Sequence, residues 1–298
     1  MKLTKNAVKV SLKLLDRKSR RKILNTPFES EPENIYDISY IEDNNELHKF
    51  DLYRAKGQVR NKTILDIHGG AYVRGSRKSQ FYYAQIFKND GYDFLVNDYE
   101  YVSKKKNITV ENQIFDCVKY LNYLDKHYKE LNISKEIFLM GDSAGGHFAL
   151  FLAEMFNNET MALRFKFEVK NLKLKGVILS CPVYDFEAAS NVKTLTKKAR
   201  KFLFGDLIVY DEWNKMLSPK EFLSCLNVPL FLTSCKLDFL KDHSISLAED
   251  LNKLEKKYTF FYLDTIDIRV QHVFNVCSLQ LEESKKANHC ILDFMSRY

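Results

Sequence analysis

The sequence predicts an α/β fold, in which a mostly parallel sheet of about eight strands lies between layers of helices. Short runs of apolar, β-branched and aromatic residues recur along the chain, and amphipathic stretches long enough for helices separate them. Most runs are continuous rather than alternating, which is typical of strands covered on both faces. The clearest runs are residues 63–67, 94–97, 137–140, 176–180, 230–234 and 259–263.

Other segments fill in the expected order of elements. Residues 35–41 and 47–53 flank the polar cluster 42–45, which predicts an antiparallel hairpin at one sheet edge. Apolar residues at three- and four-residue spacing predict helices over 110–128, 244–254 and 279–295. We expect one domain over 1–298, with a small helical cap formed from about 1–30 and 184–217, which fit the sheet poorly.

Composition and charge exclude several protein classes. The 298 residues include 45% hydrophobic residues but only 10 Gly and 5 Pro, which excludes disordered and collagen-like proteins. The net charge is +7, and the basic clusters at 104–106 and 197–201 have no interleaved aromatic residues, so we expect no nucleic-acid partner. The six cysteines lack metal-ligand spacing, which predicts free thiols and no metal.

The sequence has no apolar run long enough for a transmembrane helix, and its basic N-terminus lacks the features of a secretory signal. We therefore expect a cytoplasmic protein. Val8, Leu12 and Leu15 share one helical face of residues 1–24. This segment is interpreted as a lid or a homodimer contact, and weak attachment to an anionic membrane surface is the alternative.

The most informative segment is 141–146, Gly-Asp-Ser-Ala-Gly-Gly, which follows the apolar run 137–140 and precedes a helical pattern. A Gly-x-Ser-x-Gly motif between a strand and a helix is typical of a nucleophile elbow, which presents its serine on a tight, strained turn. Ser143 is the candidate nucleophile. A serine hydroxyl also needs a general base and a group that orients the base.

A second motif follows the strand candidate 63–67, where His68, Gly69 and Gly70 precede Ala71. The N–H groups of Gly69, Gly70 and Ala71, with that of Ala144, are candidate donors to an oxyanion formed during acyl transfer.

The two motifs together resemble the α/β-hydrolase superfamily, and within it the hormone-sensitive-lipase-like esterases. That group pairs a His-Gly-Gly-Gly loop with a Gly-Asp-Ser-Ala-Gly-Gly elbow, and the resemblance extends from about Leu47 onward. Ala71 replaces the third glycine of the loop, and its Cβ restricts the backbone there.

The resemblance also implies the other two members of a catalytic triad, in the order nucleophile, acid, histidine. Asp238 follows the strand candidate 230–234 and matches the orienting acid, and His272 follows 259–263 and matches the general base. Asp242 is the alternative acid, although we favour it as the cap of the next helix. The segment of Asp98 and Tyr99 corresponds to residues that brace the site, and Cys235 is interpreted as inert packing.

The resulting hypothesis is a serine carboxylesterase that forms an acyl-enzyme and acts on small-molecule esters with short acyl chains, without any cofactor. The short-chain preference rests on the resemblance alone. The same triad also serves amidases, formamidases and small peptidases, which the fold does not distinguish. A non-catalytic ligand-binding homologue is a further alternative, although the candidate triad is intact.

Overall fold

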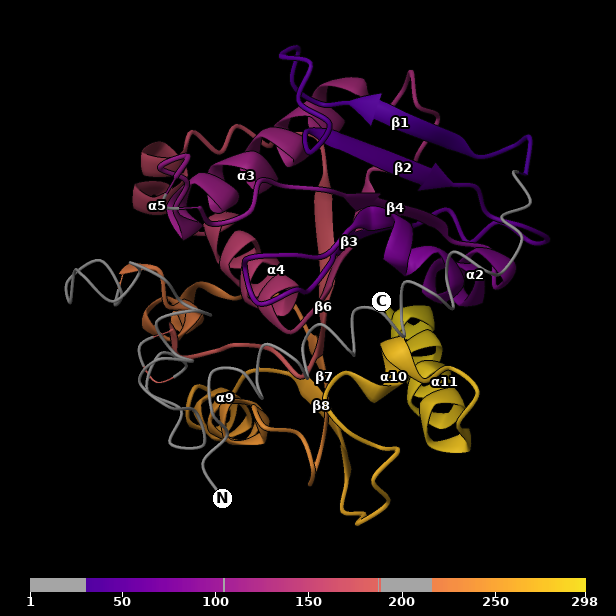
Figure 1. The fold of residues 1–298 in the computed structure, drawn as a ribbon, viewed down its shortest axis with the longest axis vertical. Helices are drawn as coiled ribbons and strands as arrows, with labels where there is room; N and C mark the ends of the chain where they lie inside the picture. The colour runs from indigo at the N-terminus through magenta and orange to yellow at the C-terminus, as the bar shows by residue number, and fades with distance from the viewer. Residues whose placement is uncertain (1–30, 104, 187, 189–215) are drawn as a thin grey trace.

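The computed structural model describes residues 31–103, 105–186, 188 and 216–298. Eight strands form one sheet in the order β1-β2-β4-β3-β5-β6-β7-β8, flanked by helices (Figure 1). The strands are β1 (Ile35–Ser39), β2 (Lys49–Tyr53), β3 (Thr63–Ile67), β4 (Asp93–Asn97), β5 (Glu136–Asp142), β6 (Lys173–Ser180), β7 (Leu230–Cys235) and β8 (Tyr258–Leu263). The predicted fold class is confirmed.

The helices alternate with the strands along the chain. The α-helices are α2 (Phe81–Asn89), α3 (Val110–His127), α4 (Ala144–Met155), α5 (Glu159–Phe165), α9 (Lys241–Lys253), α10 (Phe274–Cys277) and α11 (Glu282–Arg297). Short 3₁₀ turns are η1 (Arg77–Gln80), η3 (Pro219–Glu221) and η4 (Leu223–Cys225). The sequence did not predict α2, α5 or α10.

The sheet is parallel from β4 to β8, whereas β1 and β2 pair antiparallel at one edge, as the hairpin prediction requires. The carboxyl ends of parallel strands lie at the same side of a sheet, so the segments that follow β3, β5, β7 and β8 lie together at that side. These segments contain all the predicted site residues.

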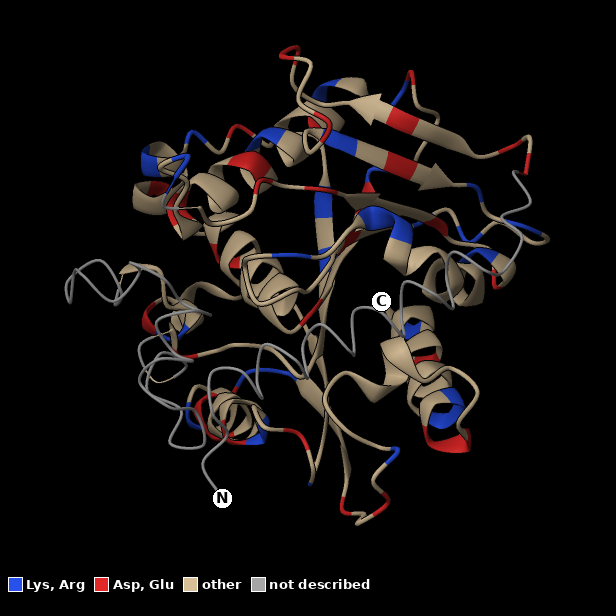
Figure 2. Cartoon of the chain, in the orientation of Figure 1, with Lys and Arg blue, Asp and Glu red and all other residues tan. Residues whose placement is uncertain are grey.

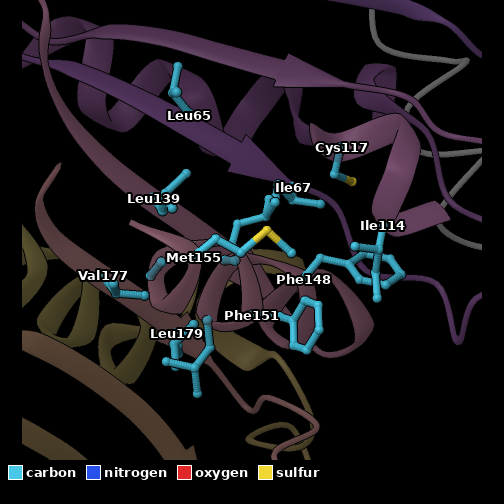
Figure 3. Packing of buried hydrophobic residues seen from close by; sticks show 14 of the residues in the cluster. Leu65, Ile67, Ile114, Cys117, Leu139, Phe148, Phe151, Met155, Val177 and Leu179 are labelled. Carbon is cyan, nitrogen blue, oxygen red and sulfur yellow. The ribbon is translucent and has the colours of Figure 1, made fainter. Parts of the chain in front are cut away.

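Helices cover both faces of the sheet. Buried residues of α3, α4 and α9 pack on one face in a large apolar cluster, and residues of α2 and α11 pack on the other. Figure 3 shows Phe148 and Phe151 of α4 between Ile114 of α3 and the strand residues Leu139 and Leu179. This packing fixes the helix that begins directly after the candidate nucleophile.

The predicted cap elements, 1–30 and 184–217, lie outside the described residues except for 184–186, 188, 216 and 217. Figure 2 shows basic and acidic residues interspersed over the helices and loops. Among the residues that the structure describes, no helix combines the length and apolarity needed to cross a bilayer.

Candidate active site

Ser143 lies in the sharp turn between β5 and α4, with φ 53° and ψ −115°. Glycines make this turn possible, because a Cβ on Gly145 would lie 1.9 Å from the carbonyl oxygen of Ile67, and one on Gly141 would lie 2.4 Å from that of Gly145. The N–H of Ser143 donates to the carbonyl of Ser180 on β6 at 2.9 Å. The turn is therefore strained at the serine and held by its neighbours.

The structure brings Ser143, His272 and Asp238 together. The Oγ of Ser143 lies 2.9 Å from Nε2 of His272, and Nδ1 of His272 lies 2.6 Å from Oδ1 of Asp238. With the proton on Nδ1 donated to the carboxylate, Nε2 presents its lone pair to the serine hydroxyl. This is the arrangement that a general base requires.

Asp238 is 2% exposed, and its surroundings favour the ionised form. Burial alone would raise its pKa, but the charge of His272 and hydrogen bonds from His272 and the Leu240 N–H hold the pKa below its usual value. The hydroxyl of Ser234 also donates to Oδ2 at 3.0 Å. The carboxylate is therefore an oriented, charged partner for the imidazole.

The surroundings of His272 include residues that sequence reasoning missed. The ring of Phe239 packs at 4.2 Å between centroids, and the N–H of Val273 donates to Sγ of the buried Cys181 at 3.3 Å. Ligand atoms of Cys181, Asp238 and His272 lie within 4.8 Å of one another, so a thiophilic metal ion could bind there. No sequence pattern links these distant residues.

The loop after β3 places backbone donors beside the elbow. Gly70, Ala71 and Tyr72 all have positive φ, at 142°, 52° and 65°. Ala71 thus adopts a left-handed backbone conformation, which glycine adopts more readily than alanine. Within the described residues, the N–H groups of Gly70, Ala71 and Ala144 have no recorded acceptor, so they are available to an oxyanion.

The N–H of Gly69, which was predicted to be an oxyanion donor, already has an acceptor within the protein. Its N–H donates to Oδ1 of Asp142 at 2.9 Å, and Gln80 donates to the same oxygen at 2.9 Å. Asp142 is buried, which raises its pKa, and the Gly69 N–H partly offsets this effect. Gly69 therefore anchors the loop to the elbow, and sequence reasoning gave no role to Asp142 or Gln80.

Residues after β4 brace the loop from behind, as predicted. The Tyr99 ring stacks on that of His68 at 4.4 Å, and its hydroxyl donates to the His68 carbonyl at 2.6 Å. Asp98 lies 3.4 Å from Nε2 of His68 and pairs with the buried Arg77. This network links η1, β4 and the loop.

His147, in the first turn of α4, supports the loop from inside. Its Nε2 donates to the Leu217 carbonyl at 2.6 Å, so Nδ1 is left to accept from the Tyr72 hydroxyl at 2.9 Å. Burial lowers the pKa of His147 to about 4. The ring is therefore neutral in the folded protein at neutral pH.

The structure also shows the positions of Asp242, the alternative acid, and of Cys235, which was interpreted as inert packing. The prediction that Asp242 caps the next helix is wrong, because Leu240 occupies the N-cap and Asp242 lies in the first turn of α9. The side chain of Asp238, rather than that of Asp242, accepts a hydrogen bond at the start of this helix, from the N–H of Leu240 at 2.9 Å. Cys235 is buried, its pKa is raised to about 11 by burial, and its thiol contacts the Val270 carbonyl.

Solved structures share this architecture. An inhibited form of esterase B from Lactobacillus rhamnosis has a TM-score of 0.83 and 21% identity, covering 96% of this chain and 94% of that one. The Francisella virulence factor BioJ has a TM-score of 0.73 and 20% identity, over 98% and 93% of the two chains. A hyperthermophilic esterase from Pyrobaculum calidifontis has a TM-score of 0.69 and 17% identity, over 97% and 93%.

These similarities, at such low identity, show the fold. No curated protein matches the sequence. The model of the BD-FAE family matches residues 50–251, which is more than half of the chain and includes the elbow, the oxyanion loop and Asp238. The predicted resemblance to α/β-hydrolases of the hormone-sensitive-lipase-like type is confirmed at this level, and the chain belongs to the BD-FAE family of α/β-hydrolase-like esterases.

Proposed function

We propose that this protein is a serine carboxylesterase that hydrolyses small esters with short acyl chains through an acyl-enzyme. The observation that carries the proposal is the continuous chain of hydrogen bonds from Ser143 through His272 to Asp238, at 2.9 and 2.6 Å. Membership of an esterase family supports the ester bond as the target.

In the proposed mechanism, His272 accepts the hydroxyl proton of Ser143 as Oγ attacks the acyl carbon. The carbonyl oxygen becomes an anion, which the N–H groups of Gly70, Ala71 and Ala144 stabilise. The imidazolium, stabilised by Asp238, then gives its proton to the leaving alcohol. Water attacks the acyl-enzyme with His272 again as the base, which releases the acid and restores the serine.

The short-chain preference rests on an analogy and on one feature of the site. A structure of esterase B from Lactobacillus rhamnosis is inhibited by a C4-C4 tributyrin phosphonate, which carries four-carbon acyl chains. In this chain, Phe239 packs against the ring of His272. We infer that this aromatic side chain, which is 59% exposed beside the base, forms part of the surface that a substrate meets.

The test compares hydrolysis of nitrophenyl esters from acetate to decanoate, with the matching nitroanilides as amide substrates. Ser143→Ala and His272→Gln should each lower kcat by at least about 10³-fold. The matched controls Ser296→Ala and His289→Gln change exposed residues of α11 and should leave kcat unchanged. Equal rates for wild type and Ser143→Ala would refute the proposal.

A fluorophosphonate probe separates catalysis from simple binding. The probe should label wild-type protein and the Ser296→Ala control but not Ser143→Ala. Folded wild-type protein that resists labelling would favour a binding homologue. Faster turnover of decanoate than of butyrate would contradict the short-chain preference, and faster turnover of nitroanilides would contradict the ester preference.

A further inference from the structure

A second cluster of ionisable side chains shares no residue with the triad. It consists of His48 beside the start of β2, Glu100 after β4 and Asp116 in α3, and the ligand atoms of the three lie within 4.8 Å of one another. These residues come from three segments that are far apart in the sequence. Sequence spacing therefore gave no indication of the cluster.

His48 is only 5% exposed and is oriented by a carboxylate. Its Nδ1 lies 2.6 Å from Oδ2 of Asp43, which fixes the proton of the neutral ring on that nitrogen. Its buried Nε2 has no hydrogen-bond partner among the described residues and lies 3.5 Å from Oδ1 of Asp116. That separation exceeds the usual range of about 2.7–3.2 Å for such hydrogen bonds.

The same separation fits two ligands of one metal ion. Ligands about 2.1 Å from a tetrahedral zinc ion lie about 3.4 Å apart, close to the 3.5 Å between His48 and Asp116. Histidines that bind metals usually donate their other N–H to a carboxylate or carbonyl, as His48 does to Asp43. With Nδ1 held by Asp43, the Nε2 atom of His48 is the one left to bind a metal ion beside Asp116.

The carboxylates of the cluster are also held in place. Asn45 donates to Oε1 of Glu100 at 3.0 Å, and the Glu100 N–H donates to Oδ2 of Asp116 at 3.1 Å, which leaves one oxygen of each carboxylate for another partner. In the described part of the chain, the ion pair of Asp116 is with His48, and no lysine or arginine forms an ion pair with Glu100 or Asp116. A divalent cation would offset this negative charge.

We propose that His48, Glu100 and Asp116 bind a structural zinc ion, with water as the fourth ligand. One nitrogen and two carboxylate ligands suit zinc better than calcium or magnesium, which prefer oxygen ligands alone. The ion would join the β1–β2 hairpin, the segment after β4 and α3. The Gln113 amide contacts the carbonyls of Glu100 and Tyr72 at 2.6 and 2.8 Å, which connects this junction to the oxyanion loop.

The test titrates chelator-treated, full-length protein with Zn²⁺ in a calorimeter. Wild type should bind one ion with micromolar or tighter affinity, and His48→Gln and Glu100→Gln should each weaken binding at least tenfold. The matched control is His127→Gln, because His127 also contacts a carboxylate, Glu130, at 2.7 Å, but at the exposed end of α3. Its zinc affinity should equal that of wild type.

Thermal unfolding gives a second readout. At a free Zn²⁺ concentration 100 times the dissociation constant, the midpoint for wild type and His127→Gln should rise by roughly 5 °C. If His48→Gln fails to fold, the half-buried Glu100→Gln variant is the one whose zinc-dependent shift in midpoint is compared with that of wild type.

Three results would overturn the proposal. The first is wild-type protein that binds no zinc, as expected if a proton occupies Nε2 of His48 instead. The second is undiminished zinc affinity in Glu100→Gln or in folded His48→Gln. The third is binding that is lost only in Cys181→Ser, which would assign the ion to the cluster of Cys181, Asp238 and His272.

Discussion

Replacing Gly70 by alanine tests whether the loop after β3 supplies oxyanion donors. Gly70 has φ 142°, and a Cβ there would lie 1.7 Å from the carbonyl oxygen of Arg74. That oxygen belongs to the backbone and cannot move aside without displacing the loop. The neighbouring Ala71 already carries a Cβ at φ 52°. Ala71→Gly therefore changes the same loop without a collision and serves as the matched control.

The size of the effect follows from the donors that would move. The N–H groups of Gly70 and Ala71 lie on the displaced segment, and one oxyanion donor is worth about 2.7–4 kcal/mol of barrier. At 1.36 kcal/mol per factor of ten, the loss of one of these two donors in Gly70→Ala should lower kcat for nitrophenyl acetate about 100- to 1,000-fold, and the loss of both should lower it further. Ala71→Gly should stay within about threefold of wild type, because it keeps both N–H groups.

The assay measures kcat and KM separately, along with the midpoint of thermal unfolding. A loss of oxyanion donors lowers kcat more than it changes KM, because these hydrogen bonds strengthen only in the transition state. Folded Gly70→Ala protein with kcat within threefold of wild type would refute the reasoning. An equal loss in Ala71→Gly would show that loop rigidity, rather than donor position, controls the rate.

Three further substitutions test the supports of the site. Ser234→Ala removes a hydrogen bond to the charged carboxylate of Asp238, so the pKa of Asp238 should rise. Denaturant titration should show that the free energy of unfolding falls by about 1.5–3 kcal/mol. His147 has its pKa lowered to about 4 from 6.5, so the unfolded chain binds this proton first as pH falls. The free energy of unfolding should therefore decrease by up to about 3 kcal/mol between pH 6.5 and 4, and His147→Gln should show a smaller decrease in the same denaturant titrations. Tyr99→Phe leaves the buried His68 carbonyl without its donor, so it should cost about 1–3 kcal/mol of stability by thermal unfolding, and an unchanged midpoint would contradict the bracing role.

The sequence was sufficient for the elements that carry strong local signals. The continuous apolar runs predicted every strand from β3 to β8. In β3, β4, β5 and β7 the reason is burial on both faces, which leaves no polar alternation to obscure the pattern. The end of β6 was predicted but its start was not, since Lys173 and Lys175 interrupt the apolar pattern where the strand leaves the core. Helix α2 was missed because its aromatic residues resemble a strand as much as a helix.

The candidate site also contains residues that local sequence signals predict and residues that they do not. Ser143 lies in a contiguous motif, and the order of the family's triad along the chain led to the prediction of Asp238 and His272. Their supports come from contacts that sequence does not encode locally. Gly69 was misassigned because its N–H is captured by Asp142, 73 positions away, and the Ser234 bond to Asp238 depends on the turn after β7.

Backbone strain around Ser143 and His272 shows how the sheet holds these two side chains together. Besides Ser143, two residues that touch the triad have positive φ without being glycine, namely Val273 at 52° and Cys181 at 50°. Each is held by a bond to another segment: Val273 donates to the thiol of Cys181, and the N–H of Cys181 donates to the Thr233 carbonyl on β7 at 2.8 Å. Because each strained residue is restrained by a neighbouring strand or loop, the serine and histidine have little freedom to separate. Their hydrogen bond therefore belongs to the resting protein and does not depend on substrate to form.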